Sequence, residues 1–336
     1  MSEKNAPTTV LQEEDGMRLD RWFKMHYPDL KFGQLQKLLR SGQIRLDGGR
    51  IKAGARVEMG QAVRVPPSVI HGNDLGKDGQ AKTVPKAKFI SAKDRDYLKS
   101  LILHRDERIL VINKPNGLAV QGGTGQTRHL DDMLDGLKFK SSSRPRLVHR
   151  LDKDTSGVLI LARDRLAAAH MANEMKGRKT HKVYWALACG VPRPLDGEVE
   201  NRIEKSGPKG AEMMNEAEDK QDGGVRAITR YQVIDQAAEQ FSWMAMQPIT
   251  GRTHQLRVHA SLMECPIVGD GKYGGRKAHP GGEISPKLHL HAHSISFIHP
   301  DGHKVYVEAP LPEHMAATWA MLGFNADGFT DPFEEE

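Results

Sequence analysis

A charged stretch that leads directly into an apolar run constrains this chain more than any other part of its sequence. Residues 149–154 read His-Arg-Leu-Asp-Lys-Asp, residues 155–157 read Thr-Ser-Gly, and residues 158–162 are apolar. The apolar run is short enough to be a buried strand, and Thr-Ser-Gly predicts a turn before it. Asp152 is therefore expected on a loop entering a core strand, where neighbouring cations keep its carboxylate ionised and available as a nucleophile or base. An ordinary exposed Asp–Arg pair is the alternative that this stretch alone leaves open.

Three other stretches carry candidate functional side chains. In residues 250–259 a Gly-Arg turn precedes a predicted helix start and brings together Arg252 and Arg257, whose planar forks suit carboxylate or phosphate groups. Residues 182–188 alternate and predict a strand carrying Tyr184, which could also be an ordinary half-buried tyrosine. The strand-like run 109–112 ends in a turn whose Lys114 could reach a phosphate or could simply be solvated.

These stretches resemble the motifs of the RluA class of RNA pseudouridine synthases. His-Arg-Leu-Asp with Thr-Ser-Gly, Lys-x-Tyr-x-Ala, Gly-Arg-Thr-His-Gln-Leu-Arg-x-His and Asn-Lys-Pro-x-Gly-Leu all occur within residues 108–310. The resemblance implies that Asp152 is the catalytic residue, that Tyr184 packs against the target uracil and that Arg257 is the ion-pair partner of Asp152. It also implies that Arg252 contacts the substrate or supports the site. Arg150 could fill the space left by a flipped base or hold a flanking phosphate.

Positive charge is concentrated near the N-terminus. Residues 16–66 hold 11 Lys/Arg and 4 Asp/Glu, whereas the rest of the chain holds 38 and 39. Apolar spacing predicts two helices there, around Leu19 and around Leu35, then a hairpin pairing residues 44–46 with 50–52, and a last short strand. The stretch resembles the alpha-L (S-four-type) RNA-binding module. We expect its basic side chains to contact RNA phosphates, in particular Arg18, Arg21, Lys37, Arg40 and Arg45.

These patterns predict an α+β protein with five parts. Residues 1–15 are expected to be disordered, 16–66 to form the RNA-binding module, 67–105 a linker, 106–323 the catalytic domain, and 324–336 an acidic disordered tail. Residues 204–224 are polar and predict a loop or insertion between strands. For the catalytic domain we expect a mixed, mainly antiparallel sheet flanked by helices and loops.

The composition argues against several other classes of protein. The 336 residues are 38% hydrophobic and include no apolar run of membrane-spanning length, and the two cysteines favour a reducing cytoplasm over a disulfide framework. His289, His291 and His293 alternate with apolar residues and could hold zinc. No Asp, Glu or Cys follows at ligand spacing, however, and a polar outer strand face is the commoner explanation. We expect a cytoplasmic monomer without metal, membrane contact or small-molecule cofactor, since the implied isomerisation is redox-neutral.

The predicted function is site-specific conversion of uridine to pseudouridine in large-subunit ribosomal RNA, acting on a flipped-out base. The sequences of residues 119–125 and 146–154 favour a family branch that modifies this RNA. A second large-subunit branch, a transfer RNA branch, a non-catalytic ribosome-assembly factor and a hydrolase with Asp152 as nucleophile remain as alternatives. Whether Asp152 attacks the sugar or the base also stays open.

Overall fold

The chain forms two compact units, residues 1–89 and residues 90–336. The computed structural model describes residues 7–28, 30–74, 90–122, 128–141, 143–177, 180–208, 213–217 and 223–334. Within these residues no helix has the length and apolarity needed to cross a membrane.

The first unit is a small α+β module, as the apolar spacing predicts. Its elements are β1 (Thr8–Thr9), the 3-10 helix η2 (Gln12–Glu14), α1 (Leu19–His26), α2 (Phe32–Arg40), β2 (Arg45–Leu46), β3 (Ala62–Arg64) and α3 (Pro67–Asp74). The predicted helical faces are confirmed, because Leu19, Trp22 and Phe23 of α1 and Leu35 and Leu39 of α2 are buried in one core. Burial of such a face, rather than helix propensity, stabilises helices this short.

Two expectations for this unit are wrong. β2 pairs with β3 rather than with residues 50–52, because the turn after β2 closes a single bridge between Leu46 and Gly49 and the apolar Val63 of β3 then lies opposite Leu46. Residues 7–15 are not disordered, since β1 pairs with β3 and Glu14 is 2% exposed. The Glu14 carboxylate accepts hydrogen bonds from the indole of Trp22 and from the Leu11 amide, each at 2.9 Å. A segment so short shows no periodicity from which this could be predicted.

The second unit carries the remaining elements. They are α4 (Ala92–Ser100), β4 (Ile102–Arg105), β5 (Ile109–Lys114), α5 (Leu130–Met133), η3 (Leu134–Leu137), β6 (Arg146–Leu147), β7 (Ser156–Ala162), α6 (Arg165–Glu174), β8 (His181–Cys189), β9 (Asp196–Ser206), β10 (Met213–Glu216), β11 (Val225–Ala237), β12 (Phe241–Pro248), α7 (Gln255–Leu262), η4 (Gly275–Ala278), β13 (Leu290–Ile298), β14 (Lys304–Glu308) and α8 (Glu313–Leu322).

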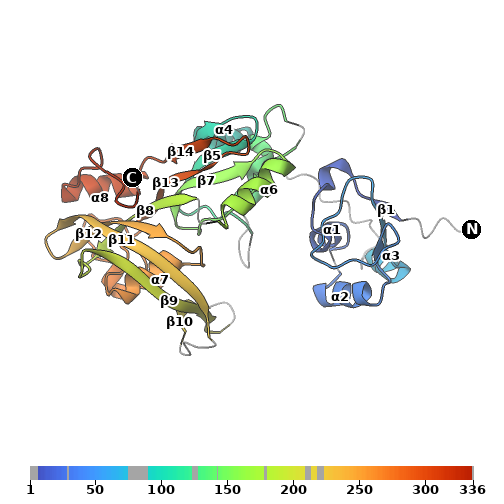
Figure 1. Ribbon diagram of the computed structural model, residues 1–336, viewed down its shortest axis with the longest axis horizontal. Helices are drawn as coiled ribbons and strands as arrows, with labels where there is room; N and C mark the ends of the chain where they lie inside the picture. The colour runs from blue at the N-terminus through green and yellow to red at the C-terminus, as the bar shows by residue number, and fades with distance from the viewer. Residues whose placement is uncertain are drawn as a thin grey trace, which may run out of the picture. The chain divides into compact units, whose positions relative to one another are not determined.

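The strands of this unit form a mixed, mainly antiparallel sheet, which confirms the predicted fold class. Their order is β10-β9-β11-β12-β8-β13-β7-β5-β4, with β14 paired to β13 and β6 paired to β7. Among the described strands only β7 and β13 run parallel, where His291 lies opposite Ser156 and Ala292 opposite Gly157. Figure 1 shows the long strands β9, β11 and β12 at one end of the sheet and β5 and β7 at the other.

Strands β5 and β7 are covered on both faces, which explains their continuous apolar sequences. On one face Leu110 and Leu159 pack with residues of α4, α5 and η3. On the other face Val111 and Ile160 pack with Met171 of α6. The chain therefore passes from the predicted catalytic loop directly into a core strand, β7.

The predicted linker 67–105 is wrong at both ends. Helix α3 begins at Pro67, and residues 75–89 lie outside the described part of the chain. Residues 90–105 belong to the second unit, where Ser91 caps α4 by accepting from the Asp94 amide at 3.0 Å and β4 pairs with β5. Because α4 buries chiefly Leu98, it lacks the amphipathic pattern that would distinguish it from a linker.

Two further segments are more ordered than their composition suggests. In the stretch 204–224, β9 continues to Ser206 and pairs with β10, forming a hairpin whose polar sequence conceals it. The predicted disordered tail is described up to residue 334, and Phe324, Phe329 and Phe333 pack on the core around Trp185 and Trp319. The Asp331 carboxylate also accepts a hydrogen bond from His181 at 2.7 Å. Burial of aromatic area offsets the acidic composition of this segment.

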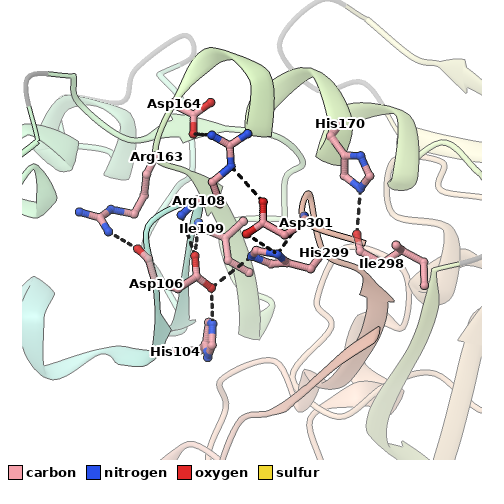
Figure 2. A network of polar contacts seen from close by, with 10 residues as sticks. All are labelled: His104, Asp106, Arg108, Ile109, Arg163, Asp164, His170, Ile298, His299 and Asp301. Carbon is pink, nitrogen blue, oxygen red and sulfur yellow. Dashed lines mark hydrogen bonds and ion pairs between the residues drawn. The ribbon is translucent and has the colours of Figure 1, made fainter. Parts of the chain in front are cut away.

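A polar network ties together three turns at the ends of strands β5, β7 and β13 that lie opposite the predicted catalytic loop (Figure 2). Asp106 accepts from the amides of Arg108 and Ile109 at 2.7 and 2.8 Å and contacts His104 at 2.6 Å. Burial acts to raise the pKa of Asp106, but these donors and the nearby His299 hold it below its ordinary value. Ion pairs of Arg108 with Asp164 and Asp301 then join the start of β5 to α6 and to the β13–β14 turn.

The contact between β7 and β13 predicts a strong effect of one methyl group. Gly157 has φ +110°, and a Cβ at this position would lie 2.2 Å from the carbonyl oxygen of Ala292. Gly302 has a similar φ of +95° but open space around it. We expect Gly157→Ala to lower the free energy of unfolding by about 3 kcal/mol or more and Gly302→Ala by about 1 kcal/mol, measured by urea denaturation. Equal losses would contradict the proposed close approach.

Candidate active site

A cavity of about 280 Å³ opens at the start of β7. Its lining includes five of the residues singled out from the sequence, which come from the loop before β7, from β8 and from the segment around the start of α7: Arg150, Asp152, Tyr184, Arg252 and Arg257. Lys114 is absent from this lining. Side chains separated by about a hundred residues in the chain thus meet in one concave site, the usual location of a catalytic centre.

Asp152 lies on the tight loop between β6 and β7. Its carbonyl accepts from the Thr155 amide at 3.3 Å, which closes the predicted turn. The side chain is 22% exposed, and its Oδ2 lies 3.8 Å from Nε2 of His254. The carboxylate is thus partly withdrawn from solvent, with one polar neighbour close by and access to the cavity.

Lys114 supports this loop instead of reaching a phosphate, so that prediction is wrong. Its ammonium is fully buried and donates to the carbonyls of Pro115, Leu118 and Lys153, each at 2.9 Å. All three of its protons are therefore used. Burial lowers its pKa to about 7, although the charges of Asp154 and Asp152 oppose the shift. Because Lys153 adjoins Asp152, this buried cation fixes the backbone that carries the candidate catalytic residue.

Arg257 pairs with Asp270, so the predicted direct ion pair with Asp152 is wrong. Its Nε and Nη2 donate to the two carboxylate oxygens of Asp270 at 2.7 and 2.6 Å, and both residues are buried. Burial acts to lower the pKa of Arg257, but Asp270 and the more distant charge of Asp152 raise it above its ordinary value. Arg257 therefore contributes positive charge near Asp152 without holding its oxygens.

His254 is the residue in contact with Asp152, and sequence reasoning assigned it no role. Its backbone has φ +55°, an uncommon conformation for a residue with a side chain, immediately before α7. Nδ1 lies 2.6 Å from the hydroxyl of Tyr273, whose oxygen accepts from the Met214 amide at 3.2 Å. The hydroxyl proton is thereby directed to Nδ1, which leaves Nε2–H facing Asp152. Burial lowers the pKa of His254, which favours the neutral ring.

Tyr184 lies on β8, which confirms the predicted strand, and its side chain lines the cavity. Burial and the charge of Asp152 raise the pKa of its phenol far above the ordinary value, so the hydroxyl keeps its proton. His149, at the start of the charged stretch, accepts from the Ile160 amide at 2.9 Å and is kept neutral because burial and Lys182 lower its pKa to about 3. The site thus combines one carboxylate with a neutral phenol and two neutral imidazoles.

Comparison with known proteins identifies the family. The family model described as RNA pseudouridylate synthase matches residues 108–262. Ribosomal large subunit pseudouridine synthase C of Rickettsia conorii is 36% identical over 88% of this chain and 94% of its own length, and the protein of the same name from Vibrio cholerae is 30% identical over 89% and 91%. The chain belongs to the RNA pseudouridine synthase family. It is therefore an enzyme, which excludes the non-catalytic and hydrolase alternatives.

The fold agrees with this assignment. The solved structure of Human RNA Pseudouridylate Synthase Domain Containing 4 matches with a TM-score of 0.57 and 30% identity, covering 69% of this chain and 97% of that one. Three of the four motifs quoted from the sequence thus converge on one cavity in a pseudouridine synthase fold, and the fourth, which contains Lys114, lies outside its lining.

In this pseudouridine synthase the buried Gln255 holds the Gly-Arg turn in place. Its Nε2 donates to the Ile228 carbonyl at 2.8 Å and to the Thr229 hydroxyl at 2.9 Å. Its Oε1 accepts from the Arg252 amide at 3.1 Å. The Arg252 guanidinium donates to the Arg226 carbonyl at 3.0 Å and remains exposed at the cavity.

The three alternating histidines are buried, so the expected polar outer strand face is wrong. β13 is a central strand whose two faces are both covered. His289 contacts the Thr318 hydroxyl at 3.0 Å, His291 contacts the Ser156 hydroxyl at 2.9 Å, and His293 stacks on Trp185 with centroids 3.6 Å apart. In the described part of the chain, no group of His, Cys, Asp or Glu is placed to hold a metal ion.

The predicted phosphate-binding residues of the first unit differ in their exposure and in the contacts that they make. Arg21, Lys37 and Arg40 are exposed on α1 and α2. Arg18 is exposed but pairs with Asp20 at 2.7 Å. The Arg45 guanidinium donates to the carbonyls of Gly42 and Gly48 at 3.1 and 3.0 Å and so stabilises its own turn.

The Arg257–Asp270 pair predicts a large loss of stability when it is broken. Asp270→Asn leaves a buried guanidinium without its counter-charge, and we expect it to lower the free energy of unfolding by about 3 kcal/mol or more. The exposed Arg226–Glu200 pair supplies the control, because Glu200→Gln should cost less than about 1 kcal/mol. Urea denaturation measures both, and a loss for Asp270→Asn no larger than for Glu200→Gln would show that the pair is not needed for the fold.

Proposed function

We propose that this enzyme converts specific uridines to pseudouridine in large-subunit ribosomal RNA, with Asp152 as its catalytic carboxylate. The observation that carries the proposal is the position of Asp152, which faces the same cavity as the protonated phenol of Tyr184. The RNA target is supported by the names of the bacterial relatives.

The reaction breaks the bond from C1′ to N1 of uracil, turns the base, and joins C1′ to C5. Cleavage leaves C1′ electron-poor, and a carboxylate stabilises or traps such a carbon. At the end C5 loses its proton and N1 gains one, so atoms and electrons balance without a cofactor. In this proposal Asp152 supplies the negative charge, while Tyr184 packs against the uracil and exchanges a proton through its neutral hydroxyl.

The reacting uridine must leave the RNA stack to reach the cavity. Arg150 is exposed beside Asp152 and, in this proposal, fills the space that the base vacates or holds a flanking phosphate. Arg252 presents a second exposed guanidinium at the cavity and suits a phosphate bidentately. Arg257, paired with Asp270, adds positive potential without leaving its partner.

The first unit is proposed to be an alpha-L (S-four-type) RNA-binding module. Its excess of basic residues and the exposed side chains of Arg21, Lys37 and Arg40 support this role. Such contacts bind the RNA backbone without reading its sequence and would anchor a large folded RNA. The free, buried Cys189 and Cys265 support a reducing compartment such as the cytoplasm.

Asp152→Asn tests the catalytic assignment. The amide is nearly isosteric but cannot act as a nucleophile, so we expect no detectable pseudouridine in a large-subunit ribosomal RNA transcript while RNA affinity stays within a few-fold. Asp154→Asn is the matched control, because Asp154 lies on the same loop with its side chain exposed, and it should retain most activity. Turnover by Asp152→Asn would refute the assignment.

The substrate class is tested in cells. Pseudouridine mapping in a strain lacking this protein should show losses at a few uridines of large-subunit ribosomal RNA, with transfer RNA unchanged. The wild-type chain should restore these sites, and Asp152→Asn should not. Losses confined to transfer RNA would overturn the proposed substrate and leave the enzyme class intact.

A further inference from the structure

Lys182 lines the same cavity and has no part in the mechanism above. Along β8, Val183, Trp185 and Leu187 point into the core beneath α8, so Lys182 and Tyr184 occupy the opposite face. Their partners across the sheet, Ile295 and Ala292 of β13, also line the cavity. Two residues along a strand span about 7 Å, so the ammonium and the phenol reach adjacent parts of one site.

In the described part of the chain, no acidic side chain pairs with Lys182. Within the described residues its ammonium takes part in no hydrogen bond or ion pair. Burial alone lowers its pKa, with no carboxylate opposing the shift, whereas Asp154 and Asp152 oppose the shift of Lys114. The adjacent His149 cannot accept from it, because its Nε2 already accepts from the Ile160 amide.

The two partly desolvated lysines of this region therefore differ in a way that points to a ligand. Lys114 uses all its protons on protein carbonyls, whereas Lys182 leaves its protons available inside a cavity. Withdrawing an ammonium from water without a partner is unfavourable, and an incoming anion would offset that cost. A nucleotide placed with its base on Tyr184 brings a phosphate of the required charge.

We propose that Lys182 is a phosphate-binding residue that holds the RNA backbone next to the flipped uridine. The proposal rests on the proposed function only in that RNA enters this cavity. Lysine binds phosphate as a point charge, which suits a single ammonium at the end of a flexible chain. A neutral contact to a uracil carbonyl is the competing role, and the salt dependence of binding separates the two.

The experiment measures the affinity for a large-subunit ribosomal RNA transcript over a range of salt concentrations. The variants are Lys182→Met, Lys182→Gln and Lys182→Arg, each combined with Asp152→Asn so that no turnover occurs. Lys304→Met is the matched control, because Lys304 is exposed on β14 and does not line the cavity. Circular dichroism shows whether each variant is folded. Because Lys182→Met and Lys182→Gln are both neutral, the test can still be made if one of them does not fold.

For both neutral variants we expect weaker binding at low salt and a slope of log affinity against log salt that is reduced in magnitude by about 0.7 to 1, the value for one phosphate contact. Lys182→Arg should keep the parental slope, and Lys304→Met should change nothing. An unchanged slope in the folded neutral variants would overturn the proposal. This holds even if Lys182→Met, made with Asp152 intact, loses turnover. Failure of the wild-type enzyme to form pseudouridine would refute the proposed function but not the slope result.

Discussion

The hydrogen bonds of one buried ammonium tie the loop before β7 to the turn after β5. Lys114 ends β5, its backbone is paired opposite Gly157, and its Nζ binds the carbonyl of Lys153. The backbone and the side chain of one residue therefore hold both sides of the segment that carries Asp152. A buried charge persists only when its protons are satisfied, so this arrangement requires an intact core around β5 and β7. The position of the reactive carboxylate consequently depends on core packing.

The cavity keeps its charged groups in separate roles. Asp270 occupies the fork of Arg257, so the ion-pair contact of Asp152 within the described residues is with His254, at 3.8 Å, and its side chain lines the cavity. Burial keeps Tyr184 protonated and favours neutral His254, which leaves Asp152 as the nearby group suited to act as a nucleophile. Environments that push neighbouring groups toward different protonation states are the usual basis of acid–base chemistry at neutral pH. Lys182 adds a cation that has no partner among the described residues, which suits the proposed phosphate contact.

Much of the fold follows from local patterns. The apolar runs 109–112 and 158–162 are buried strands, the alternating run 182–188 is β8, and a helix does begin after the Gly-Arg turn. These patterns succeed because burial of one face sets the spacing of apolar residues within a single element. Segments with few buried side chains escape this reasoning. For this reason β1 and the ordered part of the C-terminal segment were not predicted.

Residue order within the motifs is sufficient to place Asp152 on a loop before a core strand and to indicate that Tyr184, Arg252 and Arg257 share its chemistry. The hydrogen-bond and ion-pair partners of polar side chains cannot be predicted in this way, because the residues concerned lie far apart in the chain. Lys114 binds a carbonyl 39 residues away, and His291 contacts a hydroxyl 135 residues away. A polar side chain has no periodicity that reveals its partner. Asp152 and Asp270 both carry a carboxylate that could pair with Arg257, and only their three-dimensional positions distinguish them. The tertiary structure alone decided which of these side chains support the site and which face the cavity.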